Sequence, residues 1–391
     1  MTENALTPDA ERVRAVFRDQ IGGEPAVLVR SPGRVNLIGE HTDHNLGFVL
    51  PAAVDREIFL ALRLRDDHEL RFVALDKNEQ FAGSFDELRA VDAGWPNYLM
   101  GILSELRQLG VALRGVDCVF GGNVPIGSGL SSSAALECGF AFGMNALLGT
   151  ALSRIALAQL SQRSENRFVG VQCGIMDQFA SCMGRERRLI RIDCRDLSYQ
   201  YVPFERDDLC LVLCDSQVRH SLATSAYNLR RAQCEQGVAL LQERDPEIQS
   251  LRDASAAAVE ALRDEMPPEV YRRCAYVVAE NERVLATCAA LERGDLAAVG
   301  AAMYASHDGL AHGYEVSCPE LDVLVEAARP LPGVFGARMM GGGFGGCTIN
   351  LVEAEHLEAF HAGMLPAYRD KLGKEPAIHV CQVSAGTELL G

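Results

Sequence analysis

The chain has very little lysine: only Lys77, Lys371 and Lys374 among 391 residues. None of them follows a glycine loop in a Gly-Lys-Ser/Thr arrangement, which excludes a nucleotide-binding loop of the Walker type. Acidic residues outnumber basic ones by 53 to 37, so the formal net charge is −16. Because nucleic acid requires a basic surface, we expect no nucleic-acid partner, and any bound phosphate must be held locally.

Paired cysteines and long apolar runs are also absent from the sequence. The 13 cysteines are odd in number and scattered without a Cys-x-x-Cys pair, and several lie in apolar runs. This pattern predicts reduced, buried thiols and a cytoplasmic location. The N-terminus lacks the features of a signal peptide and no apolar run is long enough to span a bilayer, so we expect no membrane partner.

The length of 391 residues exceeds what one ordinary core supports and predicts two domains, 1–200 and 201–391. A first helix is expected over 8–20 with Asp9 as its cap. Further expected helices cover 95–106, 136–148, 151–168, 222–243, 252–264, 268–292, 295–310, 319–329 and 354–371. Expected strands cover 26–30, 54–64, 70–75, 116–120, 189–193, 199–204, 209–214, 334–339, 348–352 and 378–383.

Residues 121–135, GGNVPIGSGLSSSAA, stand between an expected strand and an expected helix. Glycines there allow positive φ and close approach to a ligand, and the N–H groups of the first helical turn attract anions. A glycine turn with a serine cap is the structural alternative, but the combined pattern favours phosphate binding. The expected phosphate contacts are Gly127, Ser128, Gly129, Leu130, Ser131, Ser132 and Ser133.

Residues 32–51 mix polar side chains densely with apolar residues and glycines, as loops that grip a small polar ligand do. Their core, GRVNLIGEHTDHN, resembles the motif of the galactokinase family, as does CGIMDQFAS at 173–181. Residues 121–135 and the second glycine loop, at 341–346, are similar to the other motifs of the small-molecule kinase superfamily that includes galactokinase, homoserine kinase and mevalonate kinase. The resemblance covers nearly the whole chain.

The resemblance implies an α+β fold with two lobes and an active site in the cleft between them. The N-terminal lobe would hold a mixed sheet and the glycine-rich phosphate loop, and the C-terminal lobe would be α+β. It also implies a galactokinase, which uses ATP and Mg²⁺ to phosphorylate the 1-hydroxyl of α-D-galactose. No obligate protein partner is expected.

The resemblance assigns Asp177 as the base that accepts the proton of the sugar hydroxyl. A base is needed because this hydroxyl is a poor nucleophile. Such a carboxylate must stay ionised beside a triphosphate, and Arg34 matches the cation that would hold it so and stabilise the transferred group. In isolation, Asp177 would be read as a turn or cap residue. Ser133 and Glu165 match the metal ligands, with Ser132 as the alternative serine.

The resemblance further implies contacts to the two substrates. The expected sugar-binding residues are Glu40, His41, Thr42, Asp43, Gly174 through its backbone N–H, and Tyr227 through its hydroxyl. Carboxylates suit this task because each accepts protons from more than one hydroxyl. Trp95 matches a residue that touches adenine, although a core tryptophan is the alternative. The loop at 341–346 would support the site without taking part in the chemistry.

Two positions depart from the family pattern: His44 replaces the usual tyrosine and Met340 the usual threonine. His44 is next to Asp43 and could alter how the sugar hydroxyls are held. Two alternatives therefore stay open beside galactokinase. One is a kinase of the same fold for another sugar, such as an N-acetylhexosamine, and the other is a regulator that binds galactose and ATP without turnover.

Overall fold

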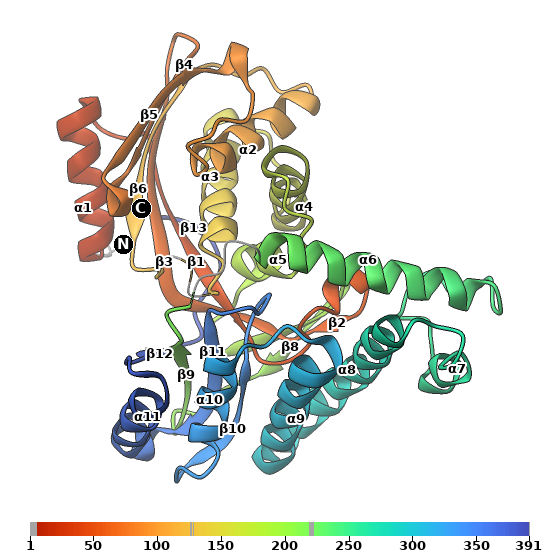
Figure 1. Ribbon diagram of the computed structural model, residues 1–391. Helices are drawn as coiled ribbons and strands as arrows, with labels where there is room; N and C mark the ends of the chain where they lie inside the picture. The colour runs from red at the N-terminus through yellow and green to blue at the C-terminus, as the bar shows by residue number, and fades with distance from the viewer. Residues whose placement is uncertain (1–5, 126, 128, 219–222, 391) are drawn as a thin grey trace.

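The computed structural model describes residues 6–125, 127, 129–218 and 223–390 (Figure 1). Its strands are β1 (Val27–Asn36), β2 (Phe48–Val49), β3 (Pro51–Leu64), β4 (Glu69–Ala74), β5 (Glu79–Ser84), β6 (Val116–Gly122), β7 (Arg188–Asp193), β8 (Tyr199–Pro203), β9 (Leu209–Asp215), β10 (Val334–Met339), β11 (Cys347–Glu353), β12 (Ala377–Cys381) and β13 (Glu388–Leu390). Its α-helices are α1 (Pro8–Val16), α2 (Pro96–Gln108), α3 (Ser132–Leu148), α4 (Arg154–Ser164), α5 (Met176–Met183), α6 (Ala223–Gln242), α7 (Ala256–Ala261), α8 (Pro268–Glu292), α9 (Leu296–Asp308), α10 (Pro319–Ala328) and α11 (Leu357–Leu372).

The largest sheet has six strands in the order β13-β1-β3-β6-β4-β5, and it is mixed because β4 and β6 run parallel. Side chains alternate between its two faces. Phe59 and Ala61 of β3 face α1, whereas Leu60 and Leu62 face the helices α2 and α3. Figure 1 shows α1 on one side of this sheet and α2, α3 and α4 on the other. Covering both faces explains why β3 is apolar over much of its length.

The second half of the chain builds an antiparallel sheet in the order β10-β11-β9-β12. Helices α9 and α10 pack against β10, α11 packs on α10, and α8 lies against α6 and α9. A small third sheet pairs β2 and β8 with β7. A mixed-sheet lobe followed by an α+β lobe is the predicted fold class. In the described residues, no helix is long and apolar enough to cross a membrane.

Several local predictions need correction. The cap of α1 is Thr7, whose hydroxyl accepts the Ala10 N–H, because the helix begins at Pro8, one residue before the predicted Asp9 cap. The helix expected over 252–264 is short, at Ala256–Ala261. Strand β13 was not predicted; it returns to the first sheet and pairs with β1. The boundary between the domains 1–200 and 201–391 stays a prediction.

Candidate active site

A cavity of about 230 Å³ brings together the motif at 32–51, the segment at 173–177, α6 and the second glycine loop. Its lining residues are Arg34, Glu40, His41, Asp43, Glu165, Val171, Cys173, Gly174, Met176, Asp177, Tyr227, Gly341, Gly342, Gly343 and Phe344. The wall therefore combines residues from both halves of the chain. It includes the predicted catalytic pair and five of the six predicted sugar contacts.

Arg34 and Asp177 form a bidentate ion pair at this cavity. Arg34 Nε lies 2.7 Å from Asp177 Oδ1, and Nη2 lies 2.9 Å from Oδ2. Burial lowers the pKa of the Arg34 guanidinium, but the charge and hydrogen bonds of Asp177 outweigh it, so the net shift is upward. The Ser131 hydroxyl also donates to Asp177 Oδ2. These contacts fix the carboxylate at the start of α5.

The glycine-rich loop lies beside the cavity and is joined to it by Arg34. Gly127 and Gly129 have φ of 74° and 80°, which confirms the predicted positive φ at both positions. Arg34 Nη1 donates to the Gly129 carbonyl, and the Arg34 N–H donates to the Leu130 carbonyl. Leu130 is buried in the core, so its predicted phosphate contact stays a prediction.

Helix α3 begins at Ser132, earlier than the expected range 136–148, so Ser132 and Ser133 occupy its first turn, and Ser131 precedes it in a left-handed conformation with φ of 55°. The first-turn N–H groups have no partner within the helix and suit an anion. Ser128 lies outside the described residues.

Ser133 and Glu165, the predicted metal ligands, lie together. Burial and the negative charge of Asp177 raise the pKa of Glu165 to about 7, although hydrogen bonds from Cys173 and Ser133 act in the opposite direction. The Gln178 amide donates to Glu165 Oε2 at 2.6 Å. Hydroxyl and carboxylate oxygens are ligands that Mg²⁺ prefers, so this pair fits a hard divalent cation.

Glu40 is 1% exposed and held by two donors from the C-terminal half. Arg338 Nη2 lies 3.1 Å from Glu40 Oε1, and the Gly341 N–H lies 2.8 Å from the same oxygen. Burial raises the pKa of Glu40, although the charges of Arg338 and Arg34 act in the opposite direction. The second glycine loop thus supports a predicted sugar contact, as expected from the sequence.

His41 and Thr42 follow Glu40 in the sequence, but His41 lines the cavity and Thr42 does not. Burial and the charge of His44 lower the pKa of His41 to about 3, so this imidazole is neutral. Its Nε2 lies 3.2 Å from the Gly342 carbonyl, and its buried Nδ1 has no protein partner in the described part of the chain. The Thr42 hydroxyl instead donates to the carbonyls of Gly39 and Phe48 and does not line the cavity. The Thr42 hydroxyl therefore fixes its own loop, and the predicted sugar contact of Thr42 stays a prediction.

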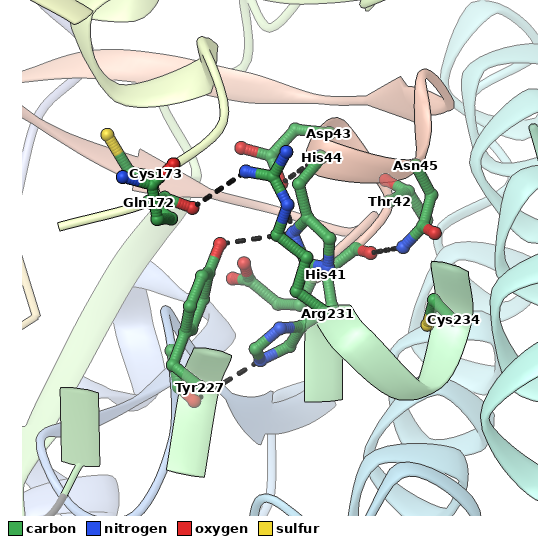
Figure 2. Close-up of polar contacts among 12 residues, drawn as sticks. His41, Thr42, Asp43, His44, Asn45, Gln172, Cys173, Tyr227, Arg231 and Cys234 are labelled. Atoms are coloured by element: carbon green, nitrogen blue, oxygen red, sulfur yellow. Dashed lines mark hydrogen bonds and ion pairs between the residues drawn. The ribbon is translucent and has the colours of Figure 1, made fainter. Parts of the chain in front are cut away.

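Asp43 packs against Gly174, and Tyr227 completes this corner of the cavity. A Cβ added at Gly174 would lie 2.0 Å from Asp43 Oδ2, so the close approach requires glycine. The Tyr227 hydroxyl lies 3.0 Å from His44 Nδ1. Figure 2 shows Asp43, His44 and Tyr227 with their neighbours on α6.

Trp95 lies apart from the cavity in the core of the first lobe, with 7% of its surface exposed. Its indole N–H donates to Glu79 Oε2 at 2.6 Å, and its ring packs edge-on against Phe120 of β6. Strand β6, on which the ring packs, leads into the glycine loop. The adenine contact of Trp95 stays a prediction.

No role was predicted from the sequence for Arg338, or for the residues of α8 that hold the motif at 32–51 in place. Arg338 is fully buried, and its guanidinium also donates to the carbonyls of Asn36 and Leu37. An arginine inside an apolar strand, directly before a glycine loop, is a signal that could have revealed it.

The fold is shared with the GHMP kinases. The family model of the GHMP kinases N terminal domain matches residues 97–185, and that of the GHMP kinases C terminal matches residues 288–367. The crystal structure of the Methanococcus jannaschii mevalonate kinase has a TM-score of 0.64 and 19% identity, and covers 92% of this chain and 99% of its own, which is a likeness of fold alone. Fold and glycine loop together define a GHMP kinase.

More specific matches lie within this class. The galactokinase galactose-binding signature matches residues 15–64. A galactokinase of Roseiflexus sp. (strain RS-1) is 44% identical over 97% of this chain and 96% of its own length, and one of Chloroflexus aurantiacus is 43% identical over 95% of each. The crystal structure of Lactococcus lactis galactokinase complexed with galactose has a TM-score of 0.93 and 34% identity, covering 97% of this chain and 99% of its own. The chain belongs to the galactokinase family and is a sugar kinase, which confirms the predicted family and fold class.

Proposed function

We propose that this enzyme transfers the γ-phosphoryl group of ATP to the 1-hydroxyl of α-D-galactose. The observation that carries the proposal is the bidentate Arg34–Asp177 pair in the wall of a cavity that also presents Glu40, His41 and Asp43. In this reaction the sugar oxygen bonds to the γ-phosphorus, the bond from that phosphorus to ADP breaks, and the hydroxyl proton passes to Asp177.

The chain's own residues supply binding and orientation. Both contacts to Glu40 use Oε1, which leaves Oε2 to accept a sugar hydroxyl. The partnerless Nδ1 of the neutral His41 is a second acceptor. Arg34 keeps Asp177 oriented and places a positive charge beside the transferred group. The N–H groups at the start of α3 suit the phosphates.

Ser133 and Glu165 would hold Mg²⁺, which supplies charge neutralisation for the phosphates when it is bound. The support for this metal site is electrostatic. No basic side chain pairs with Glu165 in the described residues, whereas Asp177 pairs with Arg34. Adding EDTA should abolish turnover and excess Mg²⁺ should restore it. Glu165→Gln should raise the Mg²⁺ concentration for half-maximal rate by about tenfold or more, since a charged ligand is lost.

The proposed location is the cytoplasm. None of the 13 cysteines, all of which lie in the described residues, forms a disulfide, and most of them are buried. Free thiols persist in reducing compartments, so this supports an intracellular enzyme that acts on a sugar and ATP.

An ADP-release assay over a panel of sugars tests the proposal. Galactose should be turned over, and the product should be the 1-phosphate by ³¹P NMR. Turnover only with another sugar, such as an N-acetylhexosamine, would assign a different sugar kinase. Galactose binding without turnover would assign a regulator.

A further inference from the structure

His44 occupies the position at which the galactokinase motif usually has tyrosine, and its side chain is fully buried behind the cavity. It lies in the short turn Asp43–Asn45, between the predicted sugar contacts and α6. The imidazole does not line the cavity itself. Its surroundings nevertheless connect it to two residues that do.

Both ring nitrogens have polar neighbours. His44 Nδ1 lies 3.0 Å from the Tyr227 hydroxyl and 3.3 Å from Asp43 Oδ1. His44 Nε2 lies 3.3 Å from the Tyr314 hydroxyl, which in turn lies 3.4 Å from the Cys234 thiol. One imidazole therefore links the motif at 32–51, α6 and the turn Gly309–Tyr314 that follows α9.

The partners determine where the protons lie. Burial raises the pKa of Asp43, but hydrogen bonds and charge from His44 outweigh it, so Asp43 is a carboxylate that only accepts. Nδ1 must therefore carry a proton, which it shares between Asp43 and the Tyr227 oxygen. If the Tyr227 oxygen accepts from His44, its own hydroxyl proton is left to donate elsewhere. Because Tyr227 lines the cavity, that donor is available to a sugar hydroxyl.

We propose that His44 is a specificity-determining positioning residue that fixes the Asp43 carboxylate as an acceptor and the Tyr227 hydroxyl as a donor toward the sugar. The inference rests on the proposed function, because it assumes that the cavity holds galactose. A tyrosine at position 44 has a single hydroxyl and cannot supply two separated ring nitrogens. The arrangement is therefore particular to chains with histidine here.

Substitutions of His44 by amides of similar shape distinguish the role of Nδ1 from that of Nε2. His44→Asn keeps an N–H donor near Nδ1, whereas His44→Gln places it near Nε2 and His44→Phe removes both. His312→Phe is the matched control, because His312 is exposed and outside the cavity wall. KM for galactose, KM for ATP and kcat are measured for each variant, together with melting temperatures.

His44→Phe and His44→Gln should raise KM for galactose by about tenfold or more, as expected for a lost charge-assisted hydrogen bond, with KM for ATP within about twofold of wild type. His44→Asn and His312→Phe should stay within about threefold. If His44→Phe does not fold, the KM values for galactose of His44→Asn and His44→Gln test the proposal. Equal KM values for His44→Asn and His44→Gln would overturn the proposal.

Monodeoxy-galactoses provide a readout that a purely structural role would not move. Wild type should discriminate against the analogue that lacks the hydroxyl facing Tyr227, and His44→Phe should lose most of that discrimination. Tyr227→Phe should lose it too, and the double variant should be no worse than either single variant. Retained discrimination in His44→Phe, or additive losses, would overturn the role of His44. Failure of wild type to phosphorylate galactose would instead overturn the proposed function.

Discussion

At the scale of single residues, the site is organised by how the carboxylates of the cavity wall are neutralised. Three of them pair with a basic side chain: Asp177 with Arg34, Glu40 with Arg338 and Asp43 with His44. Glu165 has no such partner among the described residues, and its pKa is raised to about 7 by burial and the charge of Asp177. A buried carboxylate without a cation is costly, so the exception marks the position where a metal ion fits best.

The pairing of His44 with Asp43 predicts a pH-dependent stability. Burial lowers the pKa of His44, but hydrogen bonding to Asp43 and Cys234 outweighs it and raises the pKa to about 9. Because this folded-state pKa is above the ordinary value of about 6.5, the stabilisation is complete below about pH 6.5 and is lost as pH rises through about 9. The charged and titratable groups around the ring are His41, Asp43, Tyr227, Cys234 and Tyr314.

The measurement is urea unfolding of wild type and His44→Asn between pH 6 and pH 10. The free energy of unfolding of wild type should exceed that of the variant by about 1–3 kcal/mol at pH 6, and the difference should shrink as pH rises from about 6.5 to about 9. A difference that is constant over this range would contradict the raised pKa of His44.

At the scale of secondary-structure elements, α8 holds the motif at 32–51 in place. Tyr276 donates to the Glu40 carbonyl at 3.0 Å, Glu280 Oε1 accepts the Gly39 N–H at 3.0 Å, and Asn281 Oδ1 accepts the Phe48 N–H at 2.8 Å. These three side chains satisfy backbone groups of a loop that is too irregular to satisfy its own. A helix of the C-terminal half thus fixes residues 39–48.

Glu280→Gln tests this support. The substitution keeps the volume but removes the charge that accepts from the Gly39 N–H, the Ser306 hydroxyl at 2.6 Å and Arg283 Nε at 2.7 Å. We expect a loss of about 1–3 kcal/mol in the free energy of unfolding and a higher KM for galactose. Glu282→Gln, on the exposed side of the same helix, is the control and should change neither. A Glu280→Gln variant as stable as that control would show that α8 does not support this loop.

The sequence predicted the elements and contacts that depend on local pattern. The positive φ of Gly127 and Gly129 was predictable because glycine adopts this conformation without steric cost. Contacts that depend on distant segments were not predictable. Arg338 contacts Glu40 across 298 positions of the chain, and the return of β13 to β1 pairs residues more than 350 positions apart. No local property of either segment encodes such a partner.

At the scale of the whole molecule, the cavity takes its wall from both halves of the chain. Galactose should therefore stabilise the folded protein, since a ligand that binds only the native state adds about 2.7 kcal/mol at a concentration of 100 Kd. Thermal unfolding with and without galactose measures this shift. Asp43→Ala should abolish most of it, and glucose should produce a smaller one. An identical shift with both sugars would contradict the assigned sugar.

In the proposed reaction, Asp177, oriented by Arg34, accepts the proton of the galactose 1-hydroxyl during phosphoryl transfer. The most direct test is the turnover of Asp177→Asn, which keeps the size of the side chain but removes the base. We predict that kcat falls by on the order of a hundredfold or more, while the Kd for galactose from calorimetry changes by less than about fivefold. Turnover close to that of wild type would contradict the claim.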